Sequence, residues 1–131
     1  MSTVEANITW RPTTPSGAAE NAAEALRTLN HLTLAAPTPG APGWEDVGDV
    51  YRVIGELRAL TDRLPQACGQ LAAGLQRLGD RADWRTDDGT NEHPDALVAD
   101  AVEGLQMAGR IAKDIGRSIQ QAHCSVAHLY Q

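Results

Sequence analysis

An apolar repeat in the middle of the chain determines its fold class. Between residues 50 and 82 the steps from one apolar position to the next alternate between four and three. This spacing is typical of a long helix that packs lengthwise against another helix, as in a coiled coil. The positions are Val50, Ile54, Leu57, Thr61, Leu64, Cys68, Leu71, Leu75, Leu78 and Ala82. Because Pro65 does not break the phase, we predict one helix kinked at this proline, and the alternative is a tight turn there.

Capping residues indicate two further helices. Thr14 as cap and Pro15 at the first helical position predict a helix that runs to about Leu34. The linker "APTPGAPG" follows, and residues 44–46 open the long central helix with two acidic side chains in its first turn. After a polar loop, Pro94 begins a last helix that shows no stop signal before the chain ends.

Two apolar rows run side by side along this last helix, which predicts that it contacts two neighbours. The first row is Leu97, Ala101, Gly104, Ala108, Ile111, Ile115 and Ala122. The second row is Val98, Val102, Leu105, Ala112, Ile119 and Val126. Gly104, Gly109 and Gly116 lower the helix propensity, which indicates a close approach of helices or a bend near them.

These patterns predict an all-α fold. We expect an antiparallel helical hairpin of two long helices that turns near residue 89, with the second helix of the chain kinked at Pro65. A shorter N-terminal helix completes a three- or four-helix bundle. With 131 residues, the chain fits a single domain over 14–131, preceded by an extended arm over 1–13. Residues 4–10 of the arm alternate in period two, and Trp10 is its expected anchor.

Charge and hydropathy exclude several classes of partner. A net charge of −6 disfavours nucleic acid, because phosphate binding rewards clustered basic side chains. No apolar run approaches the roughly 20 residues of a membrane span, and no signal peptide is evident, so we expect a cytoplasmic protein without a membrane partner. Ten of the eleven basic residues are arginine, which together with many Ala and Gly residues suggests a bacterial gene of high GC content.

The C-terminal segment "QQAHCSVAHLYQ" raises the question of a metal or catalytic site. Cys124 and His128 lie one helical turn apart, but a structural zinc ion needs four ligands and a catalytic one usually three. His123 continues an apolar row instead of joining them. We therefore predict a solvated helix end with no metal and no cofactor. We also predict two free thiols, with Cys68 opposite roughly residue 110.

A row of arginines carries a second expectation. Arg77, Arg81 and Arg85 stand four apart on one helix face, where like charges repel. In a hairpin that turns near residue 89 they come opposite acidic residues of the last helix, namely Asp95, Asp100 and Glu103. The sequence predicts intramolecular ion pairs between the two sets.

The architecture favours a non-enzymatic helical interaction protein, either a homodimerising scaffold or an adaptor. The first helix can cover only the part of the hairpin that holds residues 44–64. Val98, Val102 and Leu105 then have no intramolecular partner, so we predict a homodimer through this half. Trp44, Tyr51 and Tyr130 are expected to form an aromatic cluster at the other end. The alternative is a metal-dependent bundle enzyme or ligand carrier that uses some of its four histidines, His31, His93, His123 and His128.

Overall fold

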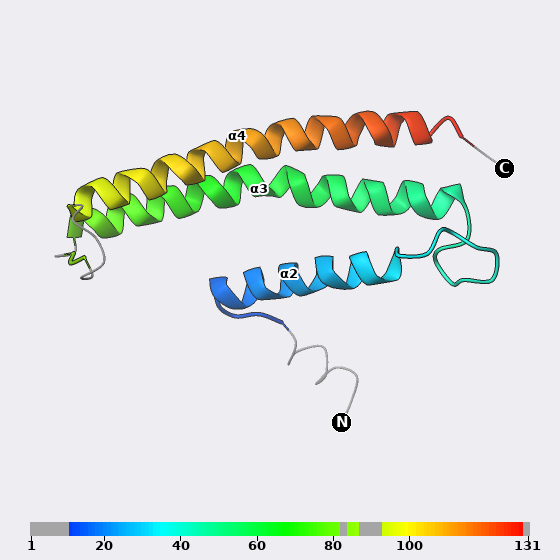
Figure 1. Ribbon diagram of the computed structural model, residues 1–131, viewed down its shortest axis with the longest axis horizontal. Coiled ribbons are helices and arrows are strands. Elements are labelled where there is room, and N and C mark those ends of the chain that lie inside the picture. Colours follow the sequence, from blue (N-terminus) through cyan, green and yellow to red (C-terminus); the bar gives the residue numbers. More distant parts are fainter. Residues whose placement is uncertain (1–10, 82–83, 87–92, 130–131) are drawn as a thin grey trace, which may run out of the picture. The chain divides into compact units, whose positions relative to one another are not determined.

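The computed structural model describes residues 11–81, 84–86 and 93–129, and this part of the chain is helical without any strand (Figure 1). The helices are α2 (Pro15–Leu32), α3 (Val47–Arg81) and α4 (Pro94–Val126). The prediction of an all-α protein is therefore confirmed. The extended arm of the first ten residues, with Trp10, lies outside the described residues.

The chain divides into two compact units, Met1–Glu45 and Asp46–Gln131. The first contains α2 and the linker that follows it, and the second contains α3 and α4. A single domain over 14–131 stays a prediction.

Helix α2 begins as its capping residues predict. The Thr14 hydroxyl accepts a hydrogen bond from the Gly17 backbone N–H at 3.1 Å, and Pro15 occupies the first helical position. The helix ends at Leu32, two residues before the predicted end, where the Thr33 N–H and hydroxyl both donate to the Leu29 carbonyl. Within the described residues, α2 has no buried side chain.

The linker after α2 is a folded turn held by Trp44. Its indole Nε1 donates to the Ala35 carbonyl at 2.7 Å, and its backbone carbonyl accepts from the Thr38 N–H. Gly40 and Gly43 supply the positive φ values of 93° and 74° that the turn needs. Trp44 therefore belongs to the linker and does not open the next helix.

Helix α3 begins three residues later than predicted because Asp46 caps it. The Asp46 carboxylate accepts from the Asp49 N–H at 3.1 Å, which satisfies a donor of the first turn. The helix then continues through Pro65 to Arg81, without the turn that was the alternative at this proline. Helix α4 begins at Pro94, with the His93 ring Nδ1 as acceptor for the Asp95 N–H.

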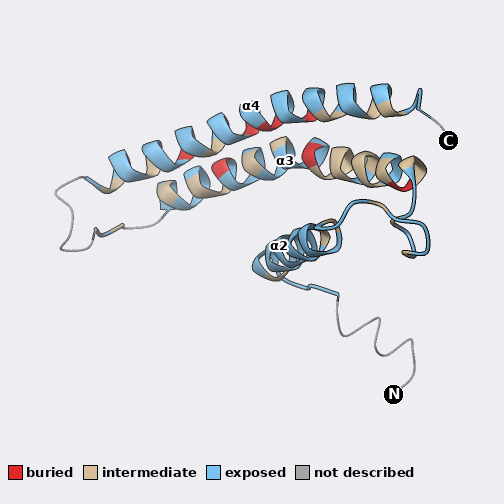
Figure 2. Cartoon of the chain, turned by 45° about the vertical axis from the view of Figure 1, so that its right-hand side comes forward, coloured by how far each residue is buried: buried red, intermediate tan, exposed pale blue. Residues whose placement is uncertain are grey.

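Helices α3 and α4 pack side by side in opposite directions (Figures 1 and 2). The neighbours of two α4 glycines and one α3 glycine define the register. A Cβ atom added to Gly109 would meet Cys68 Cβ at 3.6 Å, one added to Gly116 would meet Thr61 Oγ1 at 3.6 Å, and one added to Gly79 would meet Val98 at 3.5 Å. Cys68 thus lies opposite Gly109, one residue from the expected position 110.

We call the residues through which α3 and α4 face each other the seam. They repeat at steps of three and four on both helices. On α3 the seam is Thr61, Pro65, Cys68, Ala72, Leu75 and Gly79, and on α4 it is Val98, Val102, Leu105, Gly109, Ala112, Gly116, Ile119 and His123.

Small side chains dominate the middle of the seam. Among the described residues the buried apolar side chains are Ala72, Val102 and Ala112, and none of the large ones is fully buried. Figure 2 shows most of the buried positions on the facing sides of the two helices. Small residues let helices approach closely, but they remove little apolar area from water. The α3–α4 pair alone therefore buries little apolar surface.

The predicted assignment of Leu64, Leu71 and Leu78 to the row that faces the last helix is wrong, because each lies one residue before a seam position and remains exposed. Two adjacent rows fit the same three-four spacing. The smaller side chains occupy the seam, and the leucines turn to one side of it.

Candidate interaction surfaces

The α3–α4 pair has two faces, one on each side of the seam. Two grooves run along one of them, and residues that follow a seam position by one, from both helices, line these grooves. They include Asp62, Gln66, Ala73, Gln76, Asp80, Ala99, Glu103, Gln106, Lys113, Arg117 and Gln120. We call this side the groove face. Most of its side chains are polar or charged.

The residues that precede a seam position by one lie on the opposite side, which we call the leucine face. Since a step of one residue turns a helix by about 100°, positions before and after a seam residue point to opposite sides. The leucine face comprises Leu60, Leu64, Ala67, Leu71, Gly74 and Leu78 of α3, and Leu97, Ala101, Gly104, Ala108, Ile111, Ile115, Ser118 and Ala122 of α4. All but Ser118 are apolar or glycine.

Large apolar side chains of the leucine face are exposed. Leu71 is 58% exposed and Ile111 50%, and Leu64, Leu78, Leu97 and Ile115 are also exposed. Val102 in the seam, by contrast, is only 6% exposed. Leu75, Leu105 and Ile119 are half-buried in the seam, but the leucine face holds seven Leu and Ile side chains against these three. An apolar surface of this kind marks a place where another apolar surface binds.

The expectation that Val98, Val102 and Leu105 have no intramolecular partner is wrong. Val102 is buried, and Val98 packs beside Gly79 of α3. Leu105 lies between them and Gly109 in the same seam row and is half-buried. The second predicted row of α4 contacts α3, and the first row, which was expected in the hairpin, is the one left exposed.

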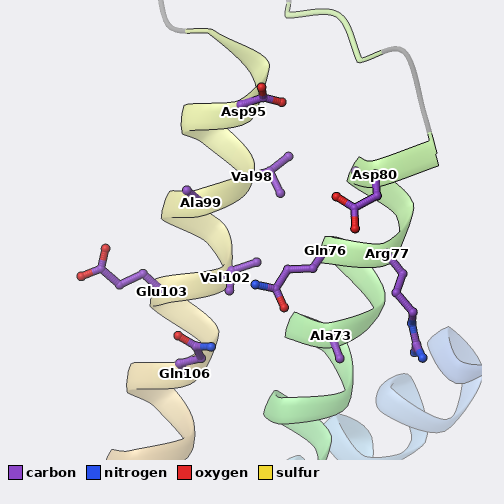
Figure 3. A pocket seen from close by; sticks show the side chains of 11 residues that line it. Ala73, Gln76, Arg77, Asp80, Asp95, Val98, Ala99, Val102, Glu103 and Gln106 are labelled. Atoms are coloured by element: carbon purple, nitrogen blue, oxygen red, sulfur yellow. The ribbon is translucent and has the colours of Figure 1, made fainter.

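The larger of the grooves, about 720 Å³, lies near the end of the pair where α3 finishes and α4 begins (Figure 3). Figure 3 shows Val98 and Val102 pointing from α4 toward α3, and Gln76 pointing back toward α4. The polar residues around it, such as Asp80 and Asp95, are exposed to solvent. The described carboxylates that line the groove are therefore solvated.

The predicted ion pairs between the arginines of α3 and the acids of α4 are wrong. Arg58 pairs with Asp62 and Arg117 pairs with Asp114, each within its own helix, and the described Arg77, Arg81 and Arg85 form no ion pair with Asp95, Asp100 or Glu103. Figure 3 shows the reason at Arg77, whose side chain points away from α4. Arg77 lies midway between the seam positions Leu75 and Gly79, so it occupies the outer edge of α3, where it also borders the larger groove.

The histidines serve separate local roles. His93 caps α4, and His123 lies in the seam, where its ring stacks on Tyr51 with centroids 4.2 Å apart and its Nε2 lies 3.1 Å from where a Gly55 Cβ would be. His31 stands at the exposed end of α2, and His128 is exposed beyond α4. In the described part of the chain, no three His, Cys, Asp or Glu side chains are grouped as metal ligands.

The predicted aromatic cluster of Trp44, Tyr51 and Tyr130 is not tested as a whole and stays a prediction. Tyr51 has an aromatic partner, but it is His123, which sequence reasoning missed. The small residue Gly55, one turn from Tyr51, leaves room for this ring. Trp44 belongs to the first unit, where it closes the linker, and Tyr130 lies outside the described residues.

Sequence reasoning also missed Trp84. The indole Nε1 of Trp84 would lie 3.3 Å from a Cβ added to Gly79. This nitrogen is buried, and it has no hydrogen-bond partner among the described residues. Trp84 therefore adds an aromatic contact at the end of the seam.

No protein-family model matches this chain, and comparisons with curated proteins and with solved structures likewise find no match. Among the described helices, none combines the length and hydropathy that crossing a membrane requires.

Proposed function

We propose that the protein is a non-enzymatic helical interaction protein whose binding surface is the leucine face. In this proposal α3 and α4 form an antiparallel hairpin, bent at Pro65, that supplies one layer of a three- or four-helix bundle. Other helices supply the second layer. The protein acts as a homodimerising scaffold or as an adaptor.

The distribution of side-chain size between the seam and the leucine face carries this proposal. A helix pair that functioned alone would place its leucines in the seam and its alanines and glycines outside. Here the middle of the seam holds Ala72, Gly109 and Ala112, and large aliphatic side chains are fewer in the seam, where they number three, than on the leucine face, where they number seven. Such a helix pair gains most of its apolar burial from a second layer.

The free energy at stake is substantial for a chain of this size. Complete burial of a Leu or Ile side chain stabilises by about 1.5–3 kcal/mol, and the six exposed large residues of the leucine face are roughly half exposed. Covering them adds about 1 kcal/mol each. Their total is comparable to the net stability of a small domain, about 5–15 kcal/mol.

A metal-dependent enzyme or ligand carrier is the weaker candidate. It would need histidines that converge, whereas His93 and His123 belong to opposite ends of α4 and each has a local contact. The groove face offers exposed polar groups around an open groove. Neither arrangement favours catalysis over binding.

Substitution of one leucine tests the proposal. Leu71→Asp places a charge in the middle of the leucine face, and Gln76→Asp places the same charge on the groove face of the same helix. We expect Leu71→Asp to lower the apparent free energy of unfolding by about 2 kcal/mol and to reduce the assembled mass in light scattering. Gln76→Asp should retain both values. If Leu71→Asp behaves like Gln76→Asp, the leucine face is not a binding surface.

A further inference from the structure

We propose that the partner of the leucine face is a second copy of this chain, arranged so that α3 of each copy packs on α4 of the other. This inference rests on the proposed function, because it names the partner of the same surface. Charges on the outer edges of α3 and α4, opposite the seam, decide both the identity of the partner and its orientation.

The outer edge of each helix is formed by residues midway between two seam positions that are four apart. On α3, Arg63 lies between Thr61 and Pro65, and Arg77 lies between Leu75 and Gly79. With Gln70 between them, this edge is basic. Figure 3 shows Arg77 pointing away from α4 as this placement requires.

The corresponding edge of α4 is acidic. Asp100 lies between Val98 and Val102, and Asp114 lies between Ala112 and Gly116, with Met107 midway along the edge. The basic and acidic edges lie on opposite sides of the α3–α4 pair. They cannot neutralise each other within one chain, since the whole width of the two helices separates them.

The acidic and basic edges are also matched in height along the helix axes. Gly79 and Val98 lie at the same height. Arg77 comes two residues before Gly79, and Asp100 comes two residues after Val98. Because α3 and α4 run in opposite directions, Arg77 and Asp100 are displaced toward the same end and lie at the same height. Thr61 and Gly116 are level too, and Arg63 and Asp114 are each two residues away from them toward the same end. Each arginine of the α3 edge therefore has an aspartate of the α4 edge at its own height.

A two-fold axis parallel to the helices converts this match into contacts. Rotation about such an axis leaves every residue at its own height and places α3 over α4 of the second copy, with the leucine faces between the two layers. Arg77 then adjoins Asp100 of the second copy, and Arg63 adjoins Asp114 of the second copy, a carboxylate that also pairs with Arg117 of its own chain. The two-fold symmetry repeats each pair.

The other face-to-face arrangement has its two-fold axis perpendicular to the helices. It would place α3 over α3 and α4 over α4. The arginines of the two copies would then share one edge and the aspartates the other, and like charges disfavour this arrangement. Charge complementarity therefore favours the parallel axis.

Reversal of one charge on each of two chains tests this arrangement. The variants are Arg77→Asp and Asp100→Arg, studied in the full chain by sedimentation at low ionic strength, where ion pairs at a surface are least screened. Alone, each variant brings two like-charged pairs into its dimer, and we expect its dissociation constant to rise about tenfold. Mixed in equal amounts, they place opposite charges at both positions and should form a heterodimer with near wild-type affinity. Lys113→Asp, on the groove face, is the matched control and should dimerise like the wild type.

The outcomes separate this inference from the proposed function. If the mixture associates no better than the single variants while Leu71→Asp still disrupts assembly, the leucine face binds but the α3-over-α4 arrangement is wrong. A wild type of 14.0 kDa at high concentration, with its leucine face protected from hydrogen exchange, would also overturn the second copy as partner, because another part of the same chain would then cover the face. Restoration by mixing supports the proposal, since no pairing within one chain can produce it.

Discussion

At the scale of single residues, glycines and alanines determine how α3 and α4 approach each other. Gly109 faces Pro65 and Cys68, and a Cβ there would lie 3.6–3.8 Å from their nearest atoms, an ordinary contact distance. Gly116 faces Thr61 and Asp62 in the same way, with Asp62 Oδ1 nearest at 3.3 Å. Only small side chains fit at these positions. The two helices are therefore close at Gly109 and Gly116, where a larger α4 side chain would force them apart.

The cysteines offer a test of this register. Cys68 is half-buried in the seam beside Gly109, and Cys124 is exposed fifteen residues further along α4, a rise of about 22 Å. A disulfide requires Cα atoms within about 7 Å. We predict that a thiol reagent modifies two cysteines per chain in denaturant without reductant. In the folded protein the reagent should modify Cys124 faster than Cys68. Absence of free thiols, or equal rates at both sites, would contradict the register.

At the scale of helices, the boundaries follow closely from local chemistry. Thr14 and Pro15 predict the start of α2, and Pro94 predicts the start of α4, because a cap or a missing N–H acts within one turn. The start of α3 was less predictable. Both Glu45 and Asp46 are plausible first-turn acids, and only the hydrogen bond of Asp46 to the Asp49 N–H distinguishes the cap.

The choice of seam could not be read from hydropathy. Leu64, Leu71 and Leu78 form the most apolar row of α3, and Pro65, Ala72 and Gly79 form the adjacent one at the same spacing. If the most apolar row of a helix is assumed to face its neighbour, the leucines are predicted to form the seam. This assumption holds only when the helix has one neighbour. The glycines of α4 at 109 and 116 were the available signal, since close approach favours small residues on both helices.

Glycine substitutions within the helices separate propensity from packing. Gly69 of α3 has no atom within 4 Å of an added Cβ, so Gly69→Ala should raise the free energy of unfolding by up to about 1 kcal/mol. Gly109→Leu adds side-chain volume against Pro65 and Cys68, and should lower it by about 1–3 kcal/mol despite better helix propensity. Urea denaturation measures both. A stabilised Gly109→Leu variant would mean that α3 and α4 are not in contact at this point.

At the scale of the whole molecule, the proposed bundle consists of two thin layers that stabilise each other. Each α3–α4 pair has small residues in the middle of its seam and more large apolar residues on the leucine face than in the seam. Its stability is then linked to protein concentration, because dissociation exposes the leucine face of both copies.

Thermal unfolding measures this linkage. We predict that tenfold dilution lowers the Tm of the wild type by a few degrees, as expected for a dimer that unfolds with dissociation. The Tm of Leu71→Asp should be lower and independent of concentration. A wild-type Tm that is constant over a hundredfold range of concentration would argue for a monomer.

The antiparallel register also sets an order of assembly along the seam. Gly79 and Val98 meet across nineteen intervening steps of the chain, whereas Gly55 and His123 meet across sixty-eight. The entropy lost on closing a loop grows with its length, and contacts between residues near in sequence form faster. Contacts near Trp84 should therefore form first, and the remaining seam contacts should follow in order toward Tyr51 and His123. That far end, where Tyr51 stacks on His123, is then the last to form during folding and the first to open.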